Sequence, residues 1–211
     1  MRVVQVNTGR RQRLEGPSFK GETGIFKTAR TGRVVVGSLG LDDDAVVDTR
    51  HHGGPDQALY LYRQEDYDWF GEQLGRPVEA GSFGENLTVA ELPSAGLPVG
   101  TRLRAPTLEL QVTAPRIPCN TLAQRMDDRD FVRRFMEARR PGLYLRVTSE
   151  GTVAAGDRFE ILPFDGPRID TVEVFTSVKR RLSAEEIERL LSVPLDERTR
   201  RDLEKRLARQ R

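Results

Sequence analysis

The sequence predicts a mainly β domain followed by a small α-helical appendage, on three observations. The first three quarters of the chain consist of short apolar runs separated by glycine, proline and aspartate. Several of these runs alternate apolar and polar residues, as a sheet with one buried face requires. After Pro163 the sequence becomes rich in Arg and Glu with helical periodicity. Many short strands with frequent turns favour a barrel over a parallel α/β sheet.

The predicted strands are short and closely spaced. They are Val3–Val6, Arg33–Val36, Ala45–Asp48, Leu59–Tyr62, Asn86–Val89, Thr101–Arg104, Leu108–Thr113, Leu143–Thr148 and Thr152–Ile161. The run from Leu108 to Thr113 alternates apolar and polar residues most regularly. Ser149-Glu150-Gly151 is typical of a hairpin turn, so we expect the last two strands to pair.

Helices are predicted both between the strands and after them. Those between are Gln64–Leu74, which Gly75 ends, then Cys119–Met126, and then Asp130–Arg139 with Asp130 as N-cap. Phe164–Pro167 is typical of a linker, and three helices follow it. The first is Val172–Val178, the second opens at the capping box Ser183–Glu186, and Asp196 caps the third. We therefore divide the chain into a β domain at residues 1–163 and a three-helix region at residues 168–211.

Composition excludes several classes of protein. The chain has 211 residues, of which 37% are apolar and 31% charged, as expected of a folded domain with a solvated surface. No apolar run approaches the roughly 18 residues that span a bilayer. A net charge of +2 argues against nucleic-acid binding by the whole chain. A single cysteine forms no internal disulfide, so we expect a cytoplasmic protein.

Cys119 lies in the segment most indicative of chemistry. The sequence Pro115-Arg116-Ile117-Pro118-Cys119-Asn120 follows a predicted strand and precedes a predicted helix. Backbone N–H groups at the start of a helix stabilise a thiolate, and Arg116 adds positive charge. A positioned thiolate suits a soft metal. The residue pattern leaves open that Cys119 is instead a buried, inert apolar residue.

Two glycine-containing segments are candidate ligand sites. His52-Gly53-Gly54 lets backbone N–H groups approach an anion, with His52 beside them as a donor. In Gly84-Glu85-Asn86, the carboxylate and the carboxamide suit the edge of a heterocycle. Both segments are also typical of plain turns. Lys27 is a candidate anion contact, whereas the run Asp42–Asp44 lacks the spacing of a calcium loop.

The order of these motifs resembles the MOSC domain family, and within it the YiiM-like branch with its three-helix C-terminal region. The motifs run Thr23-Gly24-Ile25-Phe26-Lys27, Gly40-Leu41-Asp42-Asp43-Asp44, His52-Gly53-Gly54 with Asp56-Gln57-Ala58-Leu59-Tyr60, Phe83-Gly84-Glu85-Asn86-Leu87 and Pro115-Arg116-Ile117-Pro118-Cys119. Asp42 stands where relatives are expected to have glycine. The resemblance implies a MOSC-type β-barrel, similar to the barrel of pyruvate kinase, that binds the molybdenum cofactor (molybdenum–molybdopterin).

The resemblance also implies an activity and a set of site residues. Cys119 is the implied molybdenum ligand, with His52 and Arg116 as catalytic partners. The implied cofactor-binding residues are Cys119, Arg116, Asn120, His52, Gly53, Gly54, Glu85, Asn86 and Lys27. The implied reaction reduces N-hydroxylated compounds, such as hydroxylaminopurines, to amines, and an electron-donor protein supplies the electrons.

Alternatives stay open at this stage. A non-catalytic carrier of the cofactor, or of sulfur as a persulfide on Cys119, fits the same residues. The basic run Arg198–Arg211 could dock on a nucleic acid or a protein, although Glu197 and Arg201 have the i,i+4 spacing of an ordinary solvated helix. The apolar stripe of the tail could also form a homodimer contact.

Overall fold

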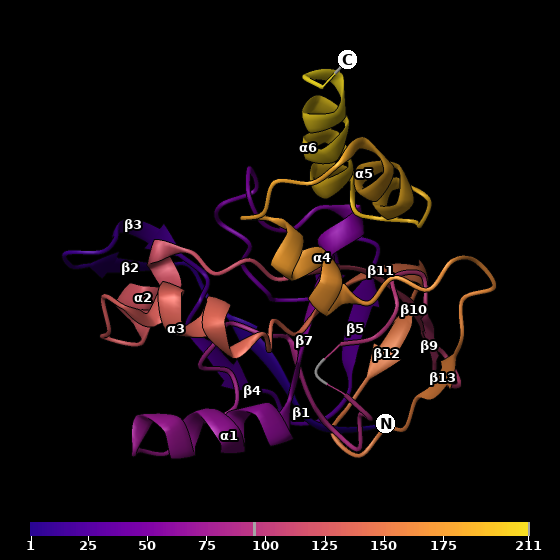
Figure 1. The fold of residues 1–211 in the computed structure, drawn as a ribbon. Helices are drawn as coiled ribbons and strands as arrows, with labels where there is room; N and C mark the ends of the chain where they lie inside the picture. Colours follow the sequence, from indigo (N-terminus) through magenta and orange to yellow (C-terminus); the bar gives the residue numbers. More distant parts are fainter. Residues whose placement is uncertain (95, 211) are drawn as a thin grey trace.

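The computed structural model describes residues 1–94 and 96–210, and its main feature is one large mixed sheet (Figure 1). The strand order is β13-β9-β10-β11-β7-β8-β1-β4. The bounds are β1 Arg2–Gly9, β4 Lys27–Ala29, β7 Leu59–Arg63, β8 Leu87–Ala90, β9 Arg102–Arg104, β10 Glu109–Pro115, β11 Leu143–Ser149 and β13 Glu160–Leu162. All neighbours in this sheet are antiparallel except β7 and β8. The mainly β fold with helices is thus as predicted.

The large sheet does not close into the predicted barrel. Its strand order leaves β13 and β4 as edges. An isolated bridge between Arg2 and Arg158 and a few backbone hydrogen bonds, such as that from the Val3 amide to the Asp157 carbonyl oxygen at 2.8 Å, join β1 to the chain before β13. The predicted hairpin across Ser149-Glu150-Gly151 is also wrong. β11 pairs with β10 and, through Leu143–Leu145, with β7, whereas β12 (Gly151–Val153) pairs with β5 (Val34–Gly37). β5 also pairs with β6 (Gly40–Leu41), which makes a separate small sheet.

Two strand predictions fail for local reasons. Ala45–Asp48 forms no strand; its first amide donates to the Gly9 carbonyl oxygen at 2.8 Å, and the segment then runs irregularly. The predicted strand Thr152–Ile161 is divided between β12 and β13. The division occurs at Gly156, whose φ of 93° belongs to a turn, and there Asp157 Oδ2 accepts from the Ala154 amide at 2.9 Å.

The helices lie close to their predicted positions. They are α1 Gln64–Leu74, α2 Asn120–Arg125, α3 Phe131–Ala138, α4 Thr171–Ser177, α5 Ala184–Leu191 and α6 Glu197–Ala208, with a short 3-10 helix, η1, at Pro55–Gln57. Gly75 ends α1 in a left-handed conformation, with φ 63°. Asp130 occupies the N-cap position of α3, but its side chain makes no capping hydrogen bond. None of the described helices is long and apolar enough to cross a membrane.

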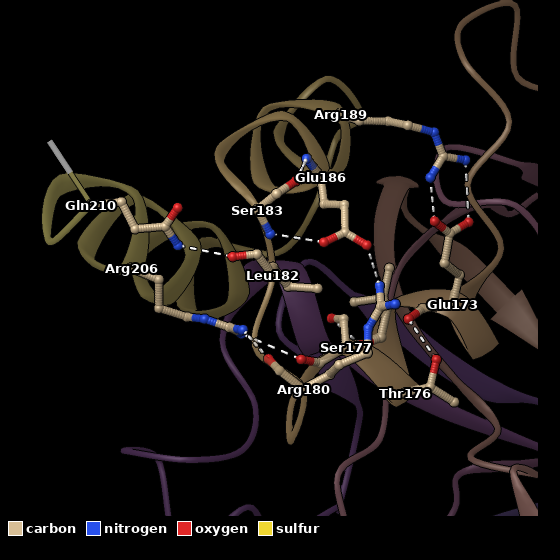
Figure 2. Close-up of polar contacts among 11 residues, drawn as sticks. Glu173, Thr176, Ser177, Arg180, Leu182, Ser183, Glu186, Arg189, Arg206 and Gln210 are labelled. Atoms are coloured by element: carbon tan, nitrogen blue, oxygen red, sulfur yellow. Dashed lines mark hydrogen bonds and ion pairs between the residues drawn. The ribbon is translucent and has the colours of Figure 1, made fainter.

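The three C-terminal helices are joined by specific polar contacts (Figure 2). The predicted capping box of α5 is present, with Ser183 and Glu186 each accepting from the other's amide. Arg206 of α6 donates to the carbonyl oxygens of Ser177 and Arg180, and Gln210 donates to that of Leu182. These helices also share an apolar cluster that includes Val174, Ile187, Leu190 and Leu203. The predicted cap of α6 is present too, since Asp196 Oδ1 accepts from two amides of its first turn.

A cluster of buried aromatic rings fills the space between the large sheet and helices α1 to α3. Phe83 lies at its centre, fully buried. Its ring is within 5.6 Å, centroid to centroid, of the rings of Tyr62, Tyr67, Phe70, Phe131 and Phe135. Two further members of the cluster, Tyr60 and Tyr144, also line the pocket described below. The cluster therefore forms one wall of that pocket, which we call its floor.

Candidate functional site

A pocket opens beside α2, where the chain leaves the large sheet. It encloses about 110 Å³ and is open to solvent at its mouth. The lining residues come from segments far apart in the sequence. They include Phe19, Thr23, Lys27, Asp44, His52, Gly53, Gln57, Tyr60, Asn86, Arg116, Cys119 and Tyr144. Five of the predicted cofactor-binding side chains thus lie in one pocket, namely Lys27, His52, Asn86, Arg116 and Cys119.

Cys119 is half-buried and occupies the N-cap position of α2, as predicted. Its backbone is extended, with φ −129° and ψ 171°, and the helix begins at the next residue. The Leu122 amide donates to the Cys119 carbonyl oxygen at 3.0 Å, within the first turn of α2. The start of α2 therefore fixes the sulfur at the pocket wall.

The Cys119 thiol is strongly acidified. Burial by itself raises its pKa, but the hydrogen bond with His52 and the charge of Arg116 outweigh burial and lower the pKa from 9.0 to about 6. Cys119 is therefore mainly a thiolate at neutral pH. The reading of Cys119 as an inert apolar residue is not supported by this environment.

His52 connects the thiol to a tyrosine. Its Nδ1 lies 2.9 Å from the Tyr144 hydroxyl oxygen, and it lines the same pocket as Cys119, whose pKa it lowers. The neighbouring His51 is exposed and contacts Asp48 instead. Of the two adjacent histidines, only His52 belongs to the pocket, because the turn points the two rings in different directions.

Arg116 supplies a buried positive charge. The residue is 5% exposed, its Nη1 donates to the Phe83 carbonyl oxygen at 2.7 Å, and its guanidinium lies 5.0 Å from the centre of the Tyr60 ring. Its Nε has no partner among the described residues. A buried, unpaired guanidinium N–H beside a thiolate is suited to receive an anionic group.

Lys27 is paired rather than free. Its ammonium forms a buried ion pair with Asp44, and both side chains are 6% exposed. Burial lowers the pKa of Lys27, against the opposing effect of Asp44. Asp44 also accepts from the Gly9 amide at 2.7 Å and from Asn86 Nδ2 at 2.8 Å. The pair therefore brings a neutral, polar hydrogen-bonding group to the pocket rather than net charge.

Glu85, Gly54 and Asn120 lie outside the pocket lining. Glu85 is fully buried behind the pocket, where it accepts from the hydroxyls of Tyr67, at 2.6 Å, and Thr88, at 2.7 Å. Burial raises its pKa, although these hydrogen bonds oppose the effect. Gly54 lines a second cleft on the far side of its loop, and Asn120 is exposed on α2. The expected Glu85–Asn86 edge is thus divided, with only Asn86 facing the pocket.

Sequence reasoning assigned no site role to several lining residues, among them Gln57, Tyr60, Tyr144 and Asp44. Tyr60 and Tyr144 lie in predicted strands. Gln57 entered only as a member of the motifs that resemble the family, and Asp44 also as part of a run without calcium-loop spacing. A signal was available for the tyrosines, since a strand position that alternates with leucine but carries a hydroxyl indicates a polar contact within the core.

Replacing His52 by alanine is expected to raise the pKa of Cys119 from about 6 towards the ~8.5 of a free cysteine, because the hydrogen bond that favours the thiolate is lost. The pH dependence of thiolate absorbance measures this directly, since the chain has one cysteine. His51→Ala is the matched control and should leave the profile unchanged. An unaltered profile in His52→Ala would refute the proposed contact.

Known proteins share this fold and sequence. The model of the MOSC domain matches residues 48–160. YflK of Bacillus subtilis is 36% identical over 160 residues, 76% of this chain and 72% of that one, and YiiM of Escherichia coli is 30% identical over 162 residues, 75% and 71%. A protein of Gibberella moniliformis named reductase is 26% identical over 85% of this chain but only 32% of its own length.

The solved structure of YiiM from Geobacillus stearothermophilus superposes on this chain with a TM-score of 0.81 and 25% identity, covering 98% of both chains. The family model spans more than half of the sequence, from the loop that carries His52 past Cys119 to β13. Two relatives at 30% identity or more cover most of the chain. The chain therefore belongs to the MOSC domain family and has the fold of its YiiM members.

Proposed function

We propose that this chain is an oxidoreductase that binds the molybdenum cofactor and reduces N-hydroxylated compounds, of the hydroxylaminopurine type, to amines. The observation that carries the proposal is the Cys119 thiolate at the wall of a pocket that also presents His52, Asn86 and buried Arg116. The MOSC domain is associated with this cofactor in general, and one distant relative is named a reductase. An electron-donor protein, which the reaction needs, is part of the proposal.

The residues present fit the cofactor. A low-pKa thiolate is the soft donor that molybdenum takes from proteins, and it lies at the pocket wall. The unpaired Nε of buried Arg116 offers a hydrogen bond to an anionic oxygen. The pocket also presents Asn86 and the neutral Lys27–Asp44 pair as polar groups for a pterin edge.

The reaction consumes two electrons and two protons, since R–NHOH becomes R–NH₂ and water. When bound, the molybdenum centre supplies the two-electron change and accepts the oxygen. The protein's own residues position the reactants and handle protons. Cys119 would hold the centre, Arg116 would fix anionic oxygens, and His52, whose ring Tyr144 holds at 2.9 Å, would deliver a proton.

Turnover by cofactor-loaded protein tests the proposal. We expect protein purified from a host that makes the cofactor to convert hydroxylaminopurine to aminopurine with an artificial reductant such as reduced viologen. Cys119→Ala should lower the rate at least about 100-fold, whereas His51→Ala, beside the site but exposed, should not.

Loaded wild-type protein that turns over no faster than Cys119→Ala would refute the reductase. In that event, a persulfide on Cys119, detected by intact mass and removed by reduction, would support a sulfur carrier instead. The carrier fits the same acidic thiol but gives no account of the buried Arg116 and the polar pocket around it.

A further inference from the structure

The loop that carries His52 is held by an arginine from the C-terminal helices. We propose that Arg198, in the first turn of α6, is a positioning residue that fixes the 49–53 loop and thereby keeps His52 against Cys119. The inference uses the proposed function only for the role of His52. The restraint on the loop is a property of the protein without cofactor, and it is tested there.

Four hydrogen bonds join the Arg198 guanidinium to main-chain carbonyl oxygens of this one loop. Nε donates to Arg50 at 3.0 Å, and Nη1 donates to Gly53 at 2.8 Å. Nη2 donates to Thr49 at 2.8 Å and to His52 at 3.3 Å. Four of the five N–H groups of the side chain thus donate to the loop. Hydrogen bonds from a charged donor are stronger than hydrogen bonds between neutral groups.

The loop has little else to hold it in place. It forms no strand, and Gly53 and Gly54 have φ values of 69° and 85°, which suit glycine. Besides the Arg198 contacts, the amides of His51 and His52 donate to the Asp48 carbonyl oxygen at 3.3 and 2.9 Å. The His51 amide and ring also contact the Asp48 carboxylate, and the His52 ring contacts the Tyr144 hydroxyl at 2.9 Å. Tyr144 restrains the His52 ring but not the main chain of the turn, which depends on Asp48 and Arg198.

The start of α6 is attached to the segment that follows the loop as well. Asp196 Oδ1 accepts from Gln57 Nε2 at 3.0 Å, and the Glu197 amide donates to Asp56 Oδ2 at 2.9 Å. Gln57 itself lines the pocket. Figure 1 shows α6 standing directly over this part of the chain. The helix therefore holds both sides of the His-Gly-Gly turn.

The other end of α6 is anchored too, so Arg198 projects from a fixed support. Arg206 and Gln210 bind carbonyl oxygens of the segment between α4 and α5 (Figure 2). A helix that is fixed at both ends can hold the loop bonded to it in one position, whereas a loosely attached helix could not. The C-terminal helices thereby contribute to the site without lining the pocket.

Hydrogen exchange and NMR of the cofactor-free protein test the inference. In Arg198→Met we expect the amides of residues 48–54 to exchange about tenfold faster or more, because the loop loses its main restraint. The chain has two histidines, so their imidazole signals are assigned with His51→Ala. The His52 signal should move towards that of a solvated ring. Arg198→Lys, which keeps the charge but not the fork, should show a smaller change of both kinds.

Arg200→Met is the matched control. This neighbouring arginine also binds two carbonyl oxygens, but they belong to Leu191 and Val193, between α5 and α6. We expect it to lower thermal stability without affecting residues 48–54. The inference is overturned if Arg198→Met and Arg198→Lys leave loop exchange at the wild-type rate, or if Arg200→Met accelerates it equally. Absence of turnover in wild-type protein would refute the reductase but not this restraint.

Discussion

Replacing Cys119 by alanine is expected to reduce the molybdenum content of protein purified from a cofactor-producing host to background. The Cys119 sulfur is the only thiolate that the chain offers, because the sequence has one cysteine. Loss of groups that merely orient a ligand costs 10- to 100-fold in metal affinity, so loss of the ligand itself should cost at least about 100-fold. Elemental analysis by mass spectrometry, together with fluorescence of the oxidised pterin, measures both parts of the cofactor.

Two controls make this result interpretable. His51→Ala lies one residue from the site and should retain the wild-type molybdenum content, since its side chain contacts Asp48 at the surface. Circular dichroism and thermal unfolding show whether Cys119→Ala is folded. Full molybdenum retention in a folded Cys119→Ala protein would contradict the assignment of the sulfur as ligand.

Replacing Phe83 by alanine is expected to destabilise the protein by about 3–5 kcal/mol, the usual cost of deleting a fully buried aromatic ring. The ring packs against five others, and no adjacent side chain can move into the cavity without breaking its own contacts. Urea denaturation measures the change as a lower midpoint at a constant slope.

Phe19→Ala serves as the comparison for Phe83→Ala. Phe19 is half-buried at the wall of the pocket, so its removal should cost much less than that of Phe83. A loss below about 1 kcal/mol for Phe83→Ala would mean that the aromatic cluster repacks, and that it does not form a rigid floor for the pocket.

The sequence predicted regular elements best where the hydrophobic period was strong. Helix α1 carries Tyr67, Phe70 and Leu74 on one face, and its predicted bounds are those observed. The strands β2 (Gln12–Glu15) and β3 (Lys20–Thr23) were missed, because they are short, polar and mostly exposed. Strands that pair through their backbones without burying an apolar face have no hydrophobic periodicity, so the sequence does not predict them.

For the site, residue types were more informative than positions. A thiol at a helix start beside an arginine could be recognised along the chain, and the structure places both in one pocket. The division between Asn86 and Glu85 could not be predicted. The two residues precede β8, and no sequence pattern shows which of them faces the pocket. Arg198 lies about 145 residues from the loop that it binds, so no local pattern connects the two.

The distance in sequence between Arg198 and Gly53 has a consequence for biosynthesis. During translation the His-Gly-Gly turn emerges from the ribosome long before the residue that restrains it, since 145 positions separate them. A nascent chain lacking α6 is expected to present His52 on an unrestrained loop. Because the bonds from Arg198 are absent until α6 has folded, we expect His52 to reach its place in the pocket late in folding.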